Sequence, residues 1–529
     1  MKTYTKLVLK IWSYRGILFP VFLCVILTIV QLHSYSYGRS NHYEILPVHF
    51  RMEDPNYLKN DFFVNAQEVF NVRTAFAWLM WRTRELCSTE YYVVYLAYYL
   101  MTSFLAYLGI WNIIKRTSPK LPMLFRSLLV LSISLLPVIS VGGTTLINSQ
   151  LLPGSFAITF AIWAFFFGME KKWRLAFLFV GIGTIFHVLL GLLSAGILLS
   201  IYLFWGRPKI KDLFINCLIY LVGAAPGWVM LMVSFINMTQ VDSELVGFVI
   251  GQFRNPHHYI PSYWPIHKLI IFFALQAFAV IFLFLRKKLK MNGLTSFFAI
   301  FFVITNIYFL LGYVFVEIIP VTLAIKMQFY RISIFNDLFI KLILLGTVLE
   351  LLWFKTRPLV IKKGIMKWIN VAFVVGLIMG LFIYIKSPAY NFLPNSPEPL
   401  HGSKVVYSWV KEETDPDSIF LTSAFVSDFR TQTERAQVIA FKPFVFNDET
   451  VVEWYKRIVD VCGFDDPPEC RGWKCRSYCN KTYATYTWGE VNSVAKKYDA
   501  DYILTTTDYN SEAKPVFDDE KNRVYKTEK

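Results

Sequence analysis

Two carboxylates in the first long polar segment of the chain could act on a hydroxyl group or hold a cation. Asp54 and Asp61 lie in one short stretch, and Asn60 precedes the second of them. A carboxylate can accept the proton of a hydroxyl as a general base, or bind a hard divalent cation through oxygen. The alternative is a solvated loop in which Asp54 and Asn60 cap turns.

A second polar segment concentrates basic and aromatic side chains. Arg254 offers a planar fork that suits phosphate oxygens. His257 and His258 can donate to phosphate, bind a metal ion or transfer a proton. The aromatic residues that follow can stack on a sugar ring, and they are Tyr259, Tyr263 and Trp264. The alternative is a loop of the interfacial aromatic belt with incidental histidines.

Further polar residues interrupt apolar stretches. Lys326 and Arg331 are predicted to bind the same phosphate as the second polar segment, because cations at membrane depth are costly and usually functional. Snorkelling to the lipid headgroups is the alternative. His187 lies within a long apolar run, and Asn148 and Gln150 lie in a polar turn. All three are predicted to line one cavity, with a hydrogen bond between helices as the alternative for His187.

The elements that must position these residues are apolar helices. Of the 529 residues, 55% are hydrophobic and 18% are aromatic, and the mean hydropathy is +0.44, which excludes a soluble globular protein. The net charge of +16 arises from Lys and Arg in short connections between apolar runs. Cytoplasmic connections of membrane proteins carry this excess, so nucleic-acid binding is not expected.

The alternation of connections predicts an α-helical polytopic membrane protein with about eleven transmembrane helices. Residues 1–386 are predicted to form the transmembrane domain, with long outer loops at 34–90 and 237–268. Prolines mark a linker at 387–400. Residues 401–529 mix helix and strand patterns and are predicted to form a small α/β domain outside the cytoplasm.

Four cysteines cluster in this last domain, and they are Cys462, Cys470, Cys475 and Cys479. An even number of closely spaced cysteines predicts two disulfides in an oxidising compartment. A zinc site is the alternative, although paired C-x-x-C spacing is missing. The spacing does not indicate which cysteines pair.

This layout resembles the GT-C superfamily of polytopic glycosyltransferases, which take a sugar from a polyprenyl-phosphate or polyprenyl-pyrophosphate carrier. The resemblance lies in the span count, the outer C-terminal domain, the long second outer loop and the stretch from Asp54 to Asp61. It implies that Asp61 or Asp54 is the catalytic carboxylate, and we favour Asp61. A divalent cation, Mg²⁺ or Mn²⁺, is a candidate cofactor, with Asp61 and His258 as candidate ligands. The paired-acid D-x-D motif is missing.

The function expected from this resemblance is transfer of a sugar from the lipid carrier to a glycan, lipid or protein acceptor on the outer face of the membrane. The expected location is a bacterial inner membrane, with the N-terminus in the cytoplasm. A polysaccharide polymerase or ligase of the O-antigen type is one alternative. A transporter or flippase and a non-catalytic scaffold are the others, although transporters favour internal repeats and charges at the bilayer midplane.

Overall fold

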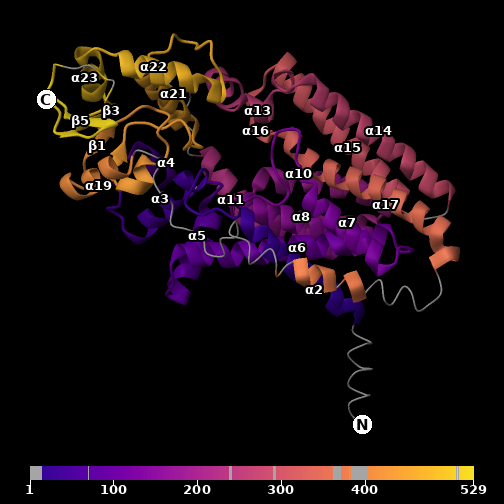
Figure 1. The fold of residues 1–529 in the computed structure, drawn as a ribbon. Coiled ribbons are helices and arrows are strands. Elements are labelled where there is room, and N and C mark those ends of the chain that lie inside the picture. The colour runs from indigo at the N-terminus through magenta and orange to yellow at the C-terminus, as the bar shows by residue number, and fades with distance from the viewer. Residues whose placement is uncertain are drawn as a thin grey trace.

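The computed structural model is a bundle of apolar helices with a small mixed domain at one end (Figure 1). The structure describes residues 15–68, 71–236, 241–289, 294–360, 371–373, 375–380, 382, 403–507, 509 and 512–528. The linker predicted at 387–400 lies outside these residues.

Six helical segments among the described residues are long and apolar enough to cross a membrane. They are α6 (Tyr91–Thr117), α10 (Val188–Ile201) with η2 (Tyr202–Gly206), α11 (Ile210–Ile236), α14 (Ile266–Lys288), α15 (Thr295–Tyr313) with η5 (Val314–Ile318), and α17 (Ser333–Val360) with the preceding α16 (Thr322–Met327) and η6 (Phe329–Ile332). These segments make the chain an integral membrane protein.

Shorter apolar helices accompany the six. They are α2 (Arg15–Gln31) with η1 (Leu32–Ser34), α7 (Met123–Leu135), α8 (Pro153–Met169), α9 (Trp173–Phe186) and a described stretch within 371–380. The expected number of about eleven spans is therefore not confirmed. The long apolar run at 175–205 is divided into α9 and α10, which meet at His187, where the backbone is extended with φ −147° and ψ 91°.

The basic connections gather at one end of the bundle. Arg116 at the end of α6 forms an ion pair with Glu170 beyond α8, with 2.7 Å between their charged atoms. Arg286 at the end of α14 donates to the carbonyl of Thr117, at 2.5 Å. Three of the basic connections are therefore neighbours, as the charge alternation predicts.

Two polar loops lie at the opposite end. The first loop (residues 34–90) holds α3 (His42–Glu53), α4 (Phe62–Glu68) and α5 (Thr74–Cys87). The second loop (described residues 241–265) holds α12 (Ser243–Gly247), η3 (Phe248–Arg254), α13 (Pro256–Tyr259) and η4 (Pro261–Tyr263).

Residues 403–528 form the small α/β domain that the sequence predicts. Its helices are α19 (Lys404–Glu413), α20 (Phe429–Thr433), α21 (Asp448–Cys462), η7 (Gly472–Lys474), α22 (Cys475–Thr485) and α23 (Trp488–Lys497). Its strands are β1 (Ile419–Leu421), β2 (Ala436–Gln437), β3 (Tyr502–Thr506), β4 (Phe517–Asp518) and β5 (Asn522–Lys526). The sheet order is β2-β1-β3-β5-β4, with β1 parallel to β2 and β3, and β5 antiparallel to β3 and β4.

Helix α21 shows why this domain packs against the loops. Val451, Trp454, Tyr455 and Ile458 recur at helical spacing and are buried on one face. Asn447 caps the start, because its side chain accepts from the backbone N–H of Glu449. The buried face therefore needs an apolar partner outside the helix.

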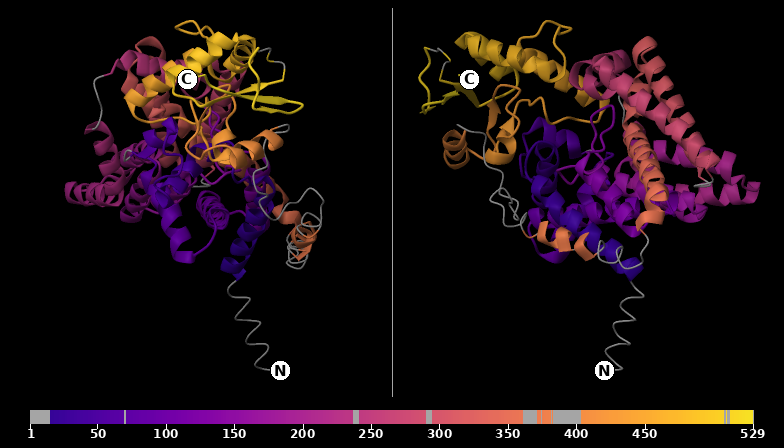
Figure 2. Two further views of the ribbon diagram at one scale, coloured as in Figure 1. Left: turned by 90° about the vertical axis from the view of Figure 1, so that its left-hand side faces the viewer. Right: turned by 45° about the vertical axis from the view of Figure 1, so that its right-hand side comes forward.

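The second loop supplies that partner. Phe253 is fully buried, and its ring centroid lies 5.4 Å from that of Tyr455 and 6.2 Å from that of Trp454. Phe63 and Val64 of the first loop belong to the same hydrophobic core. The gold C-terminal helices accordingly lie over the indigo first-loop helices in both views of Figure 2. The C-terminal domain and the two loops thus form one packed unit.

Two disulfides confirm the prediction from the cysteine cluster. Cys462 pairs with Cys479, and Cys470 pairs with Cys475. The first bridge ties the end of α21 to α22. The second closes a short loop that carries η7.

The two disulfides should differ in their contribution to stability. Replacing Cys462 and Cys479 together with Ser should cost about 3 kcal/mol, and replacing Cys470 and Cys475 about 2 kcal/mol, because the first pair is separated by 17 residues and the second by 5. Chemical unfolding of the purified protein in detergent measures both. Equal losses, or the reverse order, would contradict the loop-length argument.

Candidate functional site

A buried carboxylate on α3 brings together basic residues from both loops. Glu44 is 5% exposed, and its Oε2 lies 2.8 Å from Nη2 of Arg73, which precedes α5. Its Oε1 lies 3.5 Å from Nη2 of Arg254 at the end of η3. Glu44 stands in the first turn of α3, where the helix dipole favours a negative charge.

The C-terminal domain adds a third cation to this group. Arg254 donates to the carbonyl of Lys442, with 2.5 Å between Nη2 and O. The ammonium of Lys442 donates to Oδ1 of Asn41, at 2.7 Å. Burial lowers the pKa of Lys442; Arg254 and Arg73 lower it further, while Glu44 acts in the opposite direction. Arg73 and Arg254 therefore share the carboxylate of Glu44, and Lys442 lies close enough for these charges to affect its pKa; we call these four residues the cationic cluster.

Arg254 is the most deeply placed cation of the cluster. It is 7% exposed, and burial lowers its pKa to about 10, so it remains charged at neutral pH. Its guanidinium lies 4.2 Å from the ring centroid of Phe444 and 5.9 Å from that of Trp454. Aromatic faces compensate part of the lost hydration of a cation.

Several N–H groups at this site lack an acceptor. They belong to Nη1 of Arg73, Nε of Arg254 and Nε of Arg331. A buried donor without a partner costs about 1–3 kcal/mol, and such groups in a native structure need an explanation. An anion bound here would supply the acceptors.

Arg331 contacts His187 and lies close enough to His258 to lower the pKa of that imidazole. Like Arg73 and Arg254, it has more N–H donors than acceptors around it. Its Nη1 is 3.0 Å from Nε2 of His187, while Nδ1 of His187 faces the backbone N–H of Leu190 at 3.4 Å, where it caps α10. A neutral imidazole has one acceptor nitrogen. Both ring nitrogens of His187 face donors, so one donor is left without an acceptor.

His258 is held in a defined tautomer. Its Nδ1 is 2.5 Å from the carbonyl oxygen of Gly142, so Nδ1 carries the proton and Nε2 is the acceptor. Burial lowers the pKa of His258 to about 3, and Arg331 and His257 contribute. The rings of His257 and His258 are in contact, with centroids 4.0 Å apart and planes inclined at 45°. The imidazole is therefore neutral at physiological pH.

Three aromatic residues of the second loop hold the loop in place. The Trp264 indole donates to the carbonyl of His257 at 2.6 Å. The Tyr259 hydroxyl accepts from the amide of Gln328 at 2.7 Å. The Tyr263 ring lies 4.9 Å from the Lys474 ammonium. Each of these rings has a protein partner.

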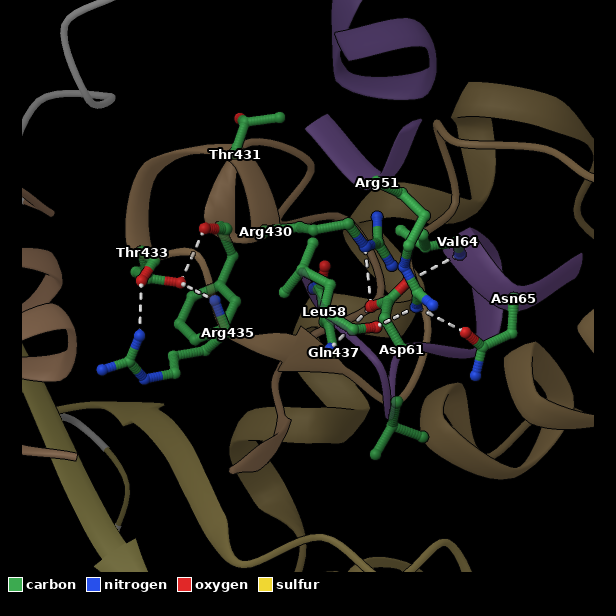
Figure 3. Close-up of polar contacts among 12 residues, drawn as sticks. Arg51, Leu58, Asp61, Val64, Asn65, Arg430, Thr431, Thr433, Arg435 and Gln437 are labelled. Carbon is green, nitrogen blue, oxygen red and sulfur yellow. Dashed lines mark hydrogen bonds and ion pairs between the residues drawn. The ribbon is translucent and has the colours of Figure 1, made fainter. Parts of the chain in front are cut away.

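Asp61 lies elsewhere (Figure 3). It is fully buried, and its Oδ2 accepts from Nε of Arg430 at 2.7 Å and from the backbone N–H of Gln437 at 3.0 Å. Its Oδ1 accepts from the backbone N–H of Val64 at 2.9 Å. Asp61 thus joins the first loop to the C-terminal domain, and the residues of the cationic cluster are not among its partners.

Of the remaining predicted residues, Gln150 and Asn148 are linked to the cluster through Asn41, whereas Lys326 and Asp54 have other partners. Gln150 accepts from Asn41, the partner of Lys442, at 3.1 Å, and its backbone N–H donates to Asn148 at 3.0 Å. Lys326 forms an ion pair with Asp448 at 2.5 Å. Asp54 is exposed, and its Oδ1 accepts from the backbone N–H of Asn56 at 2.9 Å.

Sequence reasoning missed Glu44, Arg73 and Lys442. Glu44 stands where a polar segment meets the apolar residues Ile45 and Leu46, and that context could have drawn attention to it. Arg73 and Lys442 have no such signal, because only the fold brings them to Glu44.

The donor set does not fit the divalent cation expected at Asp61 and His258. The lone pairs of Asp61 face Arg430 and two backbone N–H groups, so Asp61 is not available as a ligand, and His258 could offer only its Nε2. Among the described residues, no three His, Cys, Asp or Glu side chains gather to hold a metal ion.

A cavity opens beside the cluster. It has a volume of about 310 Å³ and lies between α3, α4 and α5. Glu44 and Arg73 form part of its wall, and Val48, Phe76 and Gln67 are among the other lining residues.

Comparison with known proteins gives limited similarity. Residues 402–461 match the model of a domain of unknown function, DUF6798. No curated protein matches the sequence. The oligosaccharyltransferase of Archaeoglobus fulgidus, tethered to an acceptor peptide containing an NVT sequon, is 10% identical with a TM-score of 0.49. The same organism's AglB, in complex with an inhibitory peptide and dolichol-phosphate, is 9% identical with a TM-score of 0.46.

Both alignments cover 93% of this chain and 70% of the other chain. We base the function on the residues of the site rather than on these similarities.

The position of Asp61 leads to a prediction about stability. Asp61→Asn should cost about 3–5 kcal/mol, because Arg430 would remain buried without a counter-charge. The double variant Asp61→Asn/Arg430→Met should recover most of this loss. Thermal unfolding of the three proteins measures it. If Asp61 were instead a catalytic base with no structural role, Asp61→Asn would unfold like the wild type.

The buried His42 leads to a prediction about pH. His42 is fully buried between the backbone N–H of Gly38 and the carbonyl of Leu151, and burial lowers its pKa to about 4 from 6.5. Between these pH values the unfolded chain binds a proton that the folded chain does not. Stability should therefore fall as pH falls from 6.5 to 4, by about 1.4 kcal/mol per pH unit for this residue.

The pH dependence of the unfolding midpoint tests this. His42→Gln should reduce the slope over that range, whereas His33→Gln, at an exposed position, should not. An unchanged slope in His42→Gln would exclude His42 as its origin.

Proposed function

We propose that this protein is a membrane glycosyltransferase of the GT-C type that takes a sugar from a polyprenyl-phosphate or polyprenyl-pyrophosphate carrier. The acceptor is a hydroxyl group of a glycan, lipid or protein. The observation that carries the proposal is the cationic cluster, in which Arg73 and Arg254 share the carboxylate of Glu44 and each retains a buried N–H group without an acceptor.

Phosphate is the ligand that suits these donors. A guanidinium presents paired N–H groups in a plane and matches two phosphate oxygens. Arg73, Arg254 and Arg331 each have one buried guanidinium nitrogen without a hydrogen-bond acceptor. A bound phosphate would satisfy these donors and neutralise the excess positive charge of the cluster.

A lipid carrier is supported by the place of the second loop in the fold. This loop leads directly into α14, whose residues Ile266 and Ile270 are 69% and 61% exposed. Exposed apolar side chains on a spanning helix face lipid. A phosphate bound beside Arg254 could therefore be attached to a chain that lies in the membrane.

In the proposed mechanism, the basic residues act on the leaving phosphate and Glu44 acts on the acceptor hydroxyl. The acceptor hydroxyl oxygen forms a bond to the anomeric carbon while the bond from that carbon to the phosphate oxygen breaks, and the phosphate leaves with the electron pair. Arg254, Arg331 and Lys442 stabilise the negative charge on the leaving phosphate. Glu44 accepts the hydroxyl proton, a role that the sequence suggested for Asp61 or Asp54.

An alternative function is a polymerase or ligase of the O-antigen type, which would depend on Arg and His rather than on a carboxylate. The full engagement of Asp61 by Arg430 favours this alternative over a mechanism through Asp61. Glu44→Gln separates the two functions, since it should abolish transfer in the first and leave transfer measurable in the second.

The proposed location is a bacterial inner membrane, with the site on the outer face and the N-terminus in the cytoplasm. Two observations support it. The disulfides suit an oxidising compartment, and basic connections gather at the end of the bundle opposite to the site.

Binding of a short carrier analogue tests the proposal. Arg254→Gln should weaken the binding of farnesyl phosphate at least tenfold, because one charge-assisted interaction contributes about 1.5–3 kcal/mol. Microscale thermophoresis of the detergent-solubilised protein measures this affinity. Arg82→Gln is the matched control, since Arg82 pairs with Glu85 on α5 of the first loop and belongs neither to the cluster nor to its surroundings.

Two further ligands identify the source of the affinity. Farnesol, which lacks the phosphate, should bind far more weakly than farnesyl phosphate, and inorganic phosphate should compete only weakly because it lacks the chain. Equal binding of farnesol and farnesyl phosphate, or unchanged affinity in Arg254→Gln, would overturn the proposal.

A further inference from the structure

The short loop closed by Cys470 and Cys475 lies against the backbone of the second loop. Gly472 stands in the middle of this disulfide loop with φ +58°, a conformation that glycine adopts without strain. A Cβ atom on Gly472 would lie 3.3 Å from Cδ of Pro256 and 3.4 Å from the carbonyl oxygen of Arg254. The backbones therefore approach as closely as a residue without a side chain permits.

The residues on either side of Gly472 add contacts to the second loop. Arg471 donates from Nη1 to Oε1 of Gln252 at 3.0 Å, and its guanidinium lies 5.5 Å from the ring centroid of Phe248. The Lys474 ammonium lies 4.9 Å from the ring centroid of Tyr263. The contacts of the disulfide loop thus extend along the second loop on both sides of Arg254.

We infer that the disulfide loop 470–475 positions Arg254 for the phosphate, so that an intact Cys470–Cys475 bridge and a glycine at 472 set the affinity of the site. This inference rests on the proposed function. Loop residues 471–474 are positioning residues, because they contact the backbone and neighbouring residues of Arg254 and not the charged groups of the cluster.

The geometry explains why the bridge is needed at this point. A chain of this length without the bridge has many conformations, and few of them place Gly472 on the Arg254 carbonyl. The Arg254 side chain must reach Glu44, the Lys442 carbonyl and the phosphate from one backbone position. A small shift of that backbone misaligns a hydrogen bond whose strength depends on direction.

Two glycine variants test the inference. Gly472→Ala should weaken farnesyl phosphate binding about tenfold, the loss expected for one misaligned charge-assisted hydrogen bond. Gly463→Ala is the matched control, because Gly463 also has a positive φ of 57° and a crowded Cβ position, yet its near neighbours are Tyr486 and Thr482. Gly463→Ala should lose stability and retain affinity.

The two disulfides provide a second test, because their removal should rank in one order for loss of stability and in the opposite order for loss of affinity. Removal of Cys462–Cys479 should lower stability more, whereas removal of Cys470–Cys475 should weaken farnesyl phosphate binding more. A purely structural role for the second bridge would give the same ranking in both measurements. Thermal unfolding and thermophoresis on the same preparations supply the two rankings.

The outcomes separate this inference from the proposed function. If Arg254→Gln weakens binding but Gly472→Ala and the Cys470→Ser/Cys475→Ser variant do not, the positioning role is wrong and the phosphate site stands. If Arg254→Gln leaves the affinity unchanged, the proposed function itself fails. The inference is supported if Gly472→Ala and the Cys470→Ser/Cys475→Ser variant bind farnesyl phosphate more weakly. The controls Gly463→Ala and Cys462→Ser/Cys479→Ser should retain their affinity.

Discussion

Burial of like charges beside one another is the constraint on which the site depends. Arg73, Arg254 and Lys442 converge on Glu44, and removing each charge from water is costly. The fold compensates with groups from two segments. Glu44 comes from the first loop, and the aromatic faces of Phe444 and Trp454, like the Lys442 carbonyl, come from the C-terminal domain.

The cluster can therefore exist only while the C-terminal domain is docked. Docking rests on the apolar contacts of Phe253 with α21 and on the buried pair of Asp61 and Arg430. A domain that looks like a separate module in the sequence thus contributes a wall of the site. Its role extends beyond recognition of a partner at the surface.

Two buried acids show how structural and chemical roles can be distinguished. Asp61 receives three hydrogen bonds from Arg430 and two backbone N–H groups, and its carboxylate is satisfied without a ligand. Glu44 is shared between two guanidiniums that keep further N–H groups unused. A fully satisfied acid stabilises a fold, whereas an acid among unsatisfied donors marks a place where another anion can bind.

The sequence predicted the elements better than their contacts. Apolar runs located the helices, and the cysteine cluster predicted two disulfides, because length, periodicity and spacing are local properties. The concentration of Arg and His in the second loop is visible in the sequence, and the structure places Arg254 beside Glu44. The placement of Asp61 could not be predicted, because its partner Arg430 lies 369 residues away in the sequence.

The number of spans shows a different limit. The helices α7, α8 and α9 are apolar but have only 13, 17 and 14 residues, at or below the shortest length for a span, so the expected number of spans is not confirmed. Lys442 shows the third limit. It stands in an ordinary polar segment, and only the docking of its domain places its ammonium beside Asn41.

The net charge of the chain combines two kinds of basic residue that the sequence does not distinguish. Lys171, Lys172 and Lys287 are exposed at the end of the bundle where the basic connections gather, and such residues report orientation in the membrane. Arg254 is buried at the opposite end among aromatic rings and other cations. Hydration compensates the first kind at no cost to the fold. The second kind requires a built environment, which the ring of Phe444 and the carboxylate of Glu44 supply, so charge count alone does not locate the site.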